Sequence, residues 1–544
     1  MKEKVDIVII GSGVAAASLS QRLLDKDPKR SILLLEAGTK VPMKDFALYQ
    51  NYLITGEYPY AFCEDLPYPS LFDAGENVSA TNNKMQLNGS RAMMYGGSTT
   101  HWGGWSFRFK PEDFNLHSNT GIKNTIDWPI DYDDLEPYYS QAEHYIGVSG
   151  DSNSGTVPRS KPYPFPFFPY TLEDGPIIDA YKKLNFEYNH LPIARHGITN
   201  TESRHAPCKT TGTCKYCPFG ARYATANFLD DMVQYGPYPN FEIRTGAVVD
   251  EIKMASKKRA AGVIYHNRFE DDPHVIEAEK VIVAAGAIEA AKLLQRSTSY
   301  WSNGVGNHKG KNLVGKNFVS HPFAYWDAKV SKNPDRLQPE MDFPTLVSRH
   351  FDSLEQQPHG KFITVHLNSF SPTFDVNSNN ATTTLTQAMQ NGYNRDQINE
   401  IVKGPMTVQL ITQIEVFSEL SNYVANTNVI NHLGLRETYV EFVPDKRFEK
   451  QLKRIKSLLA PVFKEMGATD LNMKFDSIRA DHASCLTRMS DSPDTGVVDK
   501  NLKVFGTDNV YVLSNASFSS LSAVNPTLTL TALSLRLGDH LNAK

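Results

Sequence analysis

The sequence predicts an α/β protein (α+β overall) in which a Rossmann-like nucleotide-binding domain carries an inserted antiparallel sheet. The first observation is the N-terminal run VDIVIIGSGVAAASLSQRLL, where an apolar strand, a glycine-rich turn and a helix follow one another. The second is an apolar strand, a small-residue turn and a helix in KVIVAAGAIEAAKLLQRS, residues 280–297. The third is strand-like alternation of β-branched and aromatic residues in 363–370, 404–416 and 435–445.

The N-terminal turn has the spacing of a dinucleotide-binding fingerprint. Gly11 permits the tight turn, Gly13 lets a pyrophosphate approach the backbone, and Ala16 lets helix and strand pack closely. Phosphates would lie at the helix N-terminus, where unpaired N–H groups favour anions. The next strand, SILLLEAG, ends in Glu36, whose carboxylate is placed to accept hydrogen bonds from a ribose diol. Together these features predict dinucleotide binding, with a ligand-free tight turn as the alternative.

Later segments indicate which dinucleotide is bound. The strands FEIRTGAVVDEIKM, which includes Val248, and AAGVIYHN precede the 280–297 segment, whose turn includes Ala285. A nucleotide-binding sheet completed about 270 residues downstream implies a large insertion, which is typical of flavin enzymes rather than simple nicotinamide dehydrogenases. We therefore predict FAD, with NAD as the alternative.

The composition excludes several classes of protein. The chain has 544 residues, a net charge of −4 and no long basic run, so nucleic acid is not an expected partner. No apolar stretch approaches the roughly 20 residues that cross a bilayer, so no transmembrane segment is expected. The N-terminus passes from Met1 almost directly into a strand, without a signal peptide. On these grounds we expect a cytoplasmic protein.

Two further segments carry a family resemblance. One is MMYGGSTTHWGGWSFRF at 93–109, whose glycine backbone can press against a flat ring and donate N–H groups to it. The other is DHASCLTRMSDSPDTGVVDKNLKVFGTDNVYVLSNASFSSLSAVNPTLTLTALSLRLGDHL at 481–541. With the N-terminal fingerprint, these segments resemble the glucose-methanol-choline (GMC) oxidoreductase family over about half of the chain.

The resemblance implies roles for residues at matching positions. His482 is the expected base that takes the hydroxyl proton of an alcohol while the hydride goes to flavin N5, since histidine suits proton transfer near neutral pH. Asn525 would hydrogen-bond and orient the same hydroxyl. The alternative is that His482 caps a loop and Asn525 serves its turn. The residues expected to bind FAD are Gly11, Gly13, Ala16, Glu36, Gly97, Ser98, Thr100, His101, Trp102, Val248, Ala285, Asn515, Pro526 and Thr527.

His101 raises a separate question. It lies in GGSTTHW, which is similar to a stretch of the pyranose oxidases in this family, where the histidine is bonded covalently to the flavin. The resemblance therefore suggests a covalent link at His101. The alternative is a histidine stacked beside the flavin without a bond.

Three of the five cysteines, Cys208, Cys214 and Cys217, fall within ten residues of the segment APCKTTGTCKYCPFG. Three thiolates in one place repel one another unless a metal neutralises them. Zinc with His205 as fourth ligand, a Cys214–Cys217 disulfide and plain packing are open alternatives. The segment resembles one in bacterial FAD-dependent sugar dehydrogenases, which implies an iron–sulfur cluster of the 3Fe-4S type with these three cysteines as ligands.

The resemblance also implies an overall activity. The chain is expected to be an FAD-dependent sugar dehydrogenase that oxidises a secondary alcohol of a pyranose or glucoside, specifically at C3 as in a glucoside 3-dehydrogenase. Electrons would pass through the cluster to an external acceptor, so the implied partners are a small accessory subunit and a cytochrome c or other electron acceptor. Because the small subunit of such complexes carries the export signal, the resemblance also implies a periplasmic location, by export with that partner, as the alternative to a cytoplasmic one. An oxygen-dependent pyranose-type oxidase and a non-redox lyase on the same fold stay open.

The same segments divide the chain. We expect an FAD-binding domain over 1–320, a substrate-binding domain over 321–475, and a return to the first domain over 476–544 that carries the catalytic pair. Within the first domain lie the cysteine-rich segment 205–222 and a proline-aromatic arm at 150–175 that packs on its own domain. The polar run 370–392 is expected to be an irregular loop.

Overall fold

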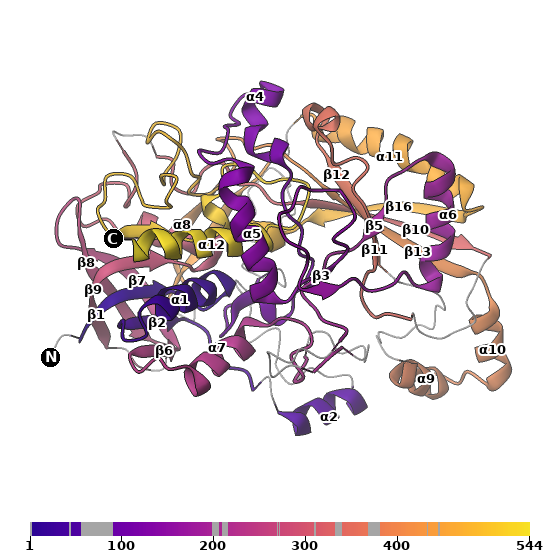
Figure 1. Ribbon diagram of the computed structural model, residues 1–544, viewed down its shortest axis with the longest axis horizontal. Coiled ribbons are helices and arrows are strands. Elements are labelled where there is room, and N and C mark those ends of the chain that lie inside the picture. The colour runs from indigo at the N-terminus through magenta and orange to yellow at the C-terminus, as the bar shows by residue number, and fades with distance from the viewer. Residues whose placement is uncertain are drawn as a thin grey trace.

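The computed structural model describes residues 3–42, 45–55, 91–198, 206–208, 216–268, 270, 272–308, 312–331, 340–367, 381–431, 434–443 and 446–543. Within these ranges the chain forms two large sheets that lie beside each other, with helices arranged around both (Figure 1). Both chain ends lie on the side of the first sheet (Figure 1).

The first sheet has a parallel core in the order β6-β2-β1-β9-β17, extended by the antiparallel strands β8 and β7. Strand β9 pairs with β1 along one side, while its other side pairs with β8 near its start and with β17 at its end. Strand β2 is buried along its whole length, which is why its sequence is almost entirely apolar. The strands are β1 (Glu3–Ile10), β2 (Ile32–Glu36), β6 (Phe241–Thr245), β7 (Ala247–Met254), β8 (Ala260–Asn267), β9 (Pro273–Val283) and β17 (Val510–Val512).

Three helices from distant parts of the sequence lie next to this sheet, and the last of them, α12, packs against both of the others (Figure 1). They are α1 (Val14–Lys26), α12 (Thr527–Asn542) and α5 (Tyr132–Ile146). Arg22 of α1 donates to Asp539 of α12 over 2.6 Å, so the last helix of the chain is bound to the first. Two more helices, α7 (Thr225–Tyr235) and α8 (Gly286–Arg296), complete this part of the molecule.

The second sheet is antiparallel, in the order β16-β10-β13-β12-β11-β5. The helices α6 (Gly175–Leu184) and α11 (Phe448–Glu465) contact each other, and Trp326 of β10 stacks on Phe463 of α11 with ring centroids 6.0 Å apart. The strands are β5 (Asn189–His190), β10 (Pro322–Val330), β11 (Leu346–Ser348), β12 (Phe362–His366), β13 (Met406–Ile414) and β16 (Thr469–Ile478).

Smaller elements fill the periphery. The arm at 150–175 packs on its own chain, because Phe168 contacts Phe343 and both Phe167 and Tyr170 stack on His190. The 3-10 helices are η1 (Gly97–Thr100), η2 (Pro111–Asn115), η3 (Leu172–Asp174), η4 (Leu354–His359), η5 (Ala480–His482) and η6 (Asn515–Ser517). The remaining helices and strands are α2 (Phe46–Thr55), α4 (Leu116–Thr120), α9 (Ala381–Gln390), α10 (Arg395–Lys403), β3 (Ser149–Gly150), β4 (Phe165–Pro166), β14 (Tyr423–Ile430) and β15 (Arg436–Glu441).

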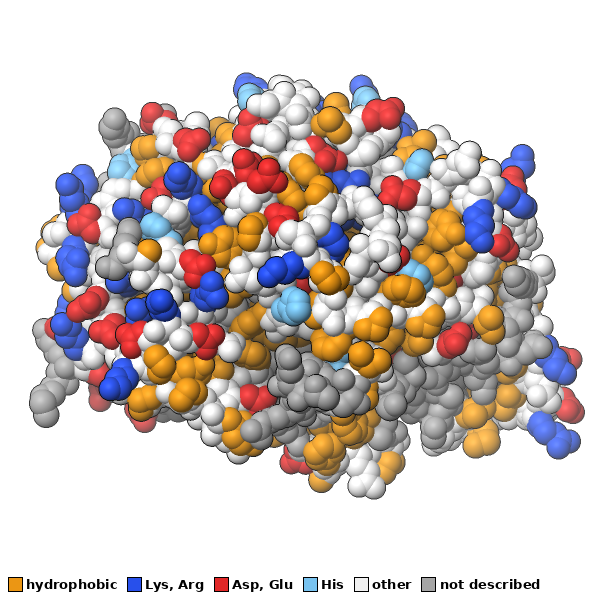
Figure 2. All heavy atoms as spheres, viewed as in Figure 1, with side chains coloured by type: hydrophobic (Ala, Val, Ile, Leu, Met, Phe, Trp, Pro, Cys, Tyr) orange, Lys and Arg blue, Asp and Glu red, His pale blue; other side chains and the backbone are white. Residues whose placement is uncertain are grey.

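The structure confirms the predicted α/β class and corrects one element. The polar run 370–392 is not wholly irregular, because residues 381–390 form α9; threonine and alanine there are tolerated in a helix, and residues 368–380 lie outside the described part. The domain boundaries at 320 and 475 stay a prediction. No helix of the described residues is both long and apolar enough to cross a membrane. Charged side chains of both signs are interspersed over the face in Figure 2.

Candidate active site

A cavity of about 940 Å³ lies between the two sheets. Its lining includes Gly11 and Glu36 at the carboxyl ends of β1 and β2, and Tyr325 and Gln413 from β10 and β13. The carboxyl end of a parallel sheet is where α/β proteins bind ligands. The cavity therefore joins a nucleotide-binding edge to a wall of the antiparallel sheet.

The glycine-rich turn after β1 is built for close backbone approach. Gly11 has φ +99°, and a Cβ there would lie 2.6 Å from the carbonyl oxygen of Ala284 at the end of β9. Gly97 has φ +60°, and a Cβ there would lie 3.2 Å from Cα of Gly13. The two loops thus meet at the start of α1, whose N-terminus favours a phosphate. These features fit a dinucleotide.

Glu36 ends β2 and is buried with its carboxylate among backbone N–H groups. It accepts hydrogen bonds from the backbone N and the hydroxyl of Ser12, at 2.9 and 2.6 Å, and from the backbone N of Gly38 at 2.8 Å. Burial raises its pKa above the ordinary value. Glu36 lines the cavity where a ribose is predicted, and it also ties the turn after β1 to the turn after β2.

The cavity wall brings together most of the residues predicted to bind FAD. Two do not reach it: Ala16 is buried inside α1, and Thr100 is buried with its hydroxyl donating to the carbonyl of Gly97 over 2.9 Å. Both hold the turns in place, and their contact with a cofactor stays a prediction. The predicted FAD-binding residues that do line the cavity are Gly11, Gly13, Glu36, Gly97, Ser98, His101, Trp102, Val248, Ala285, Asn515, Pro526 and Thr527.

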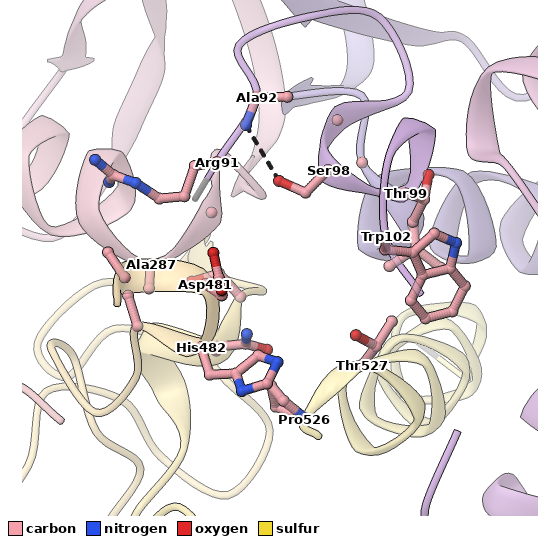
Figure 3. Close-up of a pocket in the computed structure, with 18 of the residues that line it drawn as sticks. Arg91, Ala92, Ser98, Thr99, Trp102, Ala287, Asp481, His482, Pro526 and Thr527 are labelled. Atoms are coloured by element: carbon pink, nitrogen blue, oxygen red, sulfur yellow. Dashed lines mark hydrogen bonds between the residues drawn. The ribbon is translucent and has the colours of Figure 1, made fainter. Parts of the chain in front are cut away.

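The loop that carries Ser98, His101 and Trp102 is held by a buried arginine that the sequence did not single out. Arg222 donates to the carbonyl oxygens of Thr99, Thr100 and Trp102 over 2.7–2.9 Å. Figure 3 shows Ser98 and Trp102 across the cavity from His482 and Asp481, which come from the C-terminal segment. The loop therefore forms one wall of the site and the C-terminal segment another.

His482 and Asn525, which the family resemblance pairs, meet at the cavity. Nδ2 of Asn525 lies 3.1 Å from Nε2 of His482, and Oδ1 of Asn525 has no hydrogen-bond partner among the described residues. Nδ1 of His482 lies 2.7 Å from Nδ1 of His321. Burial, with His321 and Arg479 nearby, lowers the pKa of His482 well below its ordinary value. His482 is thus a neutral imidazole near pH 7, the state a general base requires.

The rest of this end of the cavity comes from residues that sequence reasoning missed. Phe323 and Tyr325 of β10 and Gln409 and Gln413 of β13 line it beside His482. Asp481 lies there as well, and burial raises its pKa to about 6. The alternation in 404–416 indicates β13, but no pattern was identified for β10, and nothing local shows which strand faces meet the C-terminal segment.

The cysteine segment reaches the cavity wall through an arginine. Sγ of Cys208 accepts a hydrogen bond from Nη1 of Arg195 over 3.2 Å, and Arg195, which lines the cavity, lies 3.6 Å from Asp342. Cys214 and His205 lie outside the described residues. In the part that is described, no group of three or more His, Cys, Asp or Glu is arranged to hold a metal ion. Two thiols alone do not make the predicted cluster site, which stays a prediction.

Comparison with known proteins agrees with this arrangement. Two family models described as GMC oxidoreductase match residues 177–323 and 446–534. The fructose dehydrogenase large subunit of Gluconobacter japonicus is 26% identical, over 98% of this chain and 97% of that protein. The 6'''-hydroxyparomomycin C oxidase of Streptomyces lividus is 25% identical, over 99% of this chain and 92% of that protein.

Solved structures share the fold. The pyridoxine 4-oxidase from Mesorbium loti superposes with a TM-score of 0.63 at 16% identity, over 99% of both chains. A formate oxidase superposes with a TM-score of 0.65 at 15% identity, over 100% of this chain and 98% of that one. At these identities the likeness concerns the fold alone.

Proposed function

The chain belongs to the GMC oxidoreductase family, and from that premise we propose that it oxidises a secondary alcohol of a pyranose or glucoside to a ketone, with FAD as cofactor. The observation that carries the proposal is the His482–Asn525 pair at the junction between the glycine-lined part of the cavity and its antiparallel-sheet wall. When bound, FAD supplies the two-electron acceptor for the C–H bond that breaks.

The residues of the pair have complementary tasks. Nε2 of His482 takes the proton from the substrate hydroxyl, and Nδ2 of Asn525 donates a hydrogen bond to the same oxygen, which fixes its position. The low pKa of His482 keeps Nε2 free of a proton at neutral pH. Removal of that proton is general-base catalysis, which is worth about 10²–10⁴ in rate.

Several observations favour a sugar over a simple alcohol. The substrate end of the cavity combines the rings of Phe323 and Tyr325 with the amides of Gln409 and Gln413, a mixture that suits the apolar faces and hydroxyls of a pyranose. A relative matched over nearly its whole length is a fructose dehydrogenase large subunit. Oxidation at C3 of a glucoside is the specific form of the proposal.

The electron acceptor is the second part of the proposal. Three cysteines within ten residues, in a segment that resembles one in sugar dehydrogenases, favour a 3Fe-4S cluster and an external acceptor. A relative described as a large subunit favours a complex with an accessory subunit. A cytochrome c as acceptor and export with a partner are the parts of the proposal that rest on the family resemblance alone. An oxygen-dependent oxidase is the second candidate, because a relative matched over 99% of this chain is an oxidase.

The test of the reaction uses flavin-loaded protein without oxygen. Glucosides and free pyranoses should bleach the flavin absorption band, and methanol should not. His482→Ala should bind FAD equally but reduce it about 10²–10⁴-fold more slowly, since the base is lost. Bleaching at the wild-type rate in His482→Ala would place the chemistry elsewhere, and sugar turnover without bleaching would indicate lyase chemistry.

The acceptor is tested on anaerobically purified protein. About three iron atoms with matching acid-labile sulfide, lost in Cys217→Ser, would support the cluster. Absence of iron, with peroxide formed as the bleached flavin recovers in air, would support the oxidase.

A further inference from the structure

Two histidine rings face each other behind the proposed base. His321 ends the segment before β10, and its side chain is completely buried. Its Nδ1 lies 2.7 Å from Nδ1 of His482, and its Nε2 lies 2.5 Å from the carbonyl oxygen of Ser522. The ring planes cross at 85°. His321 itself is not on the cavity wall, so it does not contact a bound substrate.

The carbonyl of Ser522 determines the tautomer of His321. A carbonyl oxygen only accepts hydrogen bonds, so Nε2 of His321 carries the proton. Burial lowers the pKa of His321 to about 4, so the ring is neutral at pH 7 and holds only that one proton. Its Nδ1 is therefore a bare acceptor that points at His482.

That acceptor in turn determines the tautomer of His482. A hydrogen bond between the two Nδ1 atoms requires one proton, and only His482 can supply it. In a neutral His482 the second nitrogen is then bare, and this nitrogen is Nε2, beside Asn525. The atom that must accept the substrate proton is thus left unprotonated.

The turn that starts this sequence of hydrogen bonds is held on two sides. The Ser522 hydroxyl donates to Oδ2 of Asp113 over 2.9 Å, and Nε2 of Gln413 donates to the carbonyl of Ala523 over 2.9 Å. Asp113 is itself fixed by a buried ion pair with Lys361. The Ser522 carbonyl therefore has a fixed direction.

We propose that His321 is a positioning residue for the oxidation: oriented by the Ser522 carbonyl, it accepts a hydrogen bond from Nδ1 of His482 and holds Nε2 of His482 bare and aimed into the cavity. The inference rests on the proposed function, because it concerns the base of that reaction. When Nε2 takes the substrate proton, His482 becomes an imidazolium whose Nδ1–H still has His321 as acceptor. His321 therefore stabilises the proton-accepting form as well as selecting the tautomer.

Other charges near the pair act on its titration but not on its tautomer. Arg479 and Asp481 lie on the segment before His482 and are bonded to each other over 3.0 Å. From β10 the nearest ring is that of Phe323, with its centroid 5.9 Å from the His482 ring. None of these groups hydrogen-bonds Nδ1 of His482, and among the described residues its acceptor is His321.

Two matched substitutions separate the two nitrogens of His321. His321→Asn places an amide oxygen near the Nδ1 position and keeps the acceptor for His482. His321→Gln reaches the Nε2 position and keeps the donor to Ser522, but offers His482 no acceptor. His482 becomes positively charged when it takes the substrate proton, and only His321→Gln removes the acceptor for the Nδ1–H of that imidazolium. We therefore expect flavin reduction to slow about 10- to 100-fold in His321→Gln and by about threefold or less in His321→Asn.

A readout on His482 itself completes the test. Hydrogen–deuterium exchange at the imidazole C2 is measured in flavin-free protein as a function of pH, by mass spectrometry of the tryptic peptide 480–488. Because His482 is the only histidine of that peptide, the measurement gives the pKa of His482. The pKa should be lower in His321→Gln than in His321→Asn, since the imidazolium loses its acceptor. If His321→Gln does not fold, His321→Leu takes its place with the same expectation.

The outcomes distinguish this inference from the proposed function. Equal slowing in both variants, in proportion to lost thermal stability and with an unshifted pKa of His482, would show a structural role and overturn the proposal. A large effect of His482→Ala with none of His321→Gln would overturn it while leaving the proposed function intact. If sugars do not bleach the wild-type flavin but His321→Gln still shifts the pKa of His482, the proposed function would be wrong and the His321–His482 hydrogen bond would still be supported.

Discussion

A buried ion cluster beside the active site gives the sharpest stability prediction, which concerns Lys361→Met. Lys361 lies just before β12 and forms ion pairs with Asp113 and, over 3.0 Å, with Asp352; all three side chains are at most 1% exposed. Methionine fills a similar volume but leaves two buried carboxylates short of a cation, although Arg349 still contacts Asp352 over 2.6 Å. Loss of one partner from a buried pair costs about 3–5 kcal/mol.

This magnitude is measurable as a shift in the thermal midpoint. From the average unfolding entropy per residue, a chain of 544 residues loses about 1 °C of Tm per kcal/mol, so Lys361→Met should unfold about 3–5 °C below the wild type. The assay is intrinsic fluorescence during heating at a fixed scan rate and pH 7.

A surface pair provides the matched control. Lys183 lies 3.4 Å from Glu465, with 62% of its side chain exposed, so Lys183→Met should cost no more than about 1 kcal/mol. If Lys361→Met lowers Tm no more than Lys183→Met does, the inference that Asp113 and Asp352 need Lys361 as their buried cation would be refuted.

The remaining predictions concern one buried acid and one amide. The pKa of Glu415 is raised to about 8 by burial, above its ordinary 4.5, so the native state retains a proton that the unfolded chain releases and stability falls as pH rises from about 4.5 to 8. Glu415→Gln should therefore show a smaller drop in Tm between pH 5.5 and pH 8.5 than the wild type, and an equal drop would contradict the shift. Asn525→Ala removes a neutral hydrogen-bond donor and should slow flavin reduction by about 2- to 10-fold, far less than His482→Ala; stopped-flow absorbance measures both, and equal losses would mean that Asn525 does more than orient the hydroxyl.

The sequence predicts those parts of the site that are local in the chain. Gly11, Gly13 and Glu36 follow from strand, turn and helix within about 30 residues, and the structure places all three on the cavity. The position of His482 beside Asn525 could be predicted only through a family resemblance, because no periodicity joins them.

Other parts depend on contacts between distant segments, which no local pattern encodes. His321 and His482 are 161 residues apart, and Lys361 and Asp113 are 248 apart. A histidine before a strand and a lysine before a strand are ordinary surface residues by composition. His321 is buried by contact with His482 and Ser522 of the C-terminal segment, and Lys361 by contact with Asp113 and Asp352. The same limit applies to Arg222, whose three backbone contacts are made across more than 100 residues.

The most direct test of the central claim identifies the product. Flavin-loaded protein is incubated with a methyl glucoside and an artificial electron acceptor, and the sugar is analysed by carbon NMR. We predict one new ring ketone for each two electrons transferred, with loss of the C–H signal at that carbon, and about 10²–10⁴-fold slower product formation by His482→Ala. An aldehyde or acid at the primary alcohol would contradict secondary-alcohol oxidation, and an unchanged sugar together with an unbleached flavin would contradict sugar oxidation altogether.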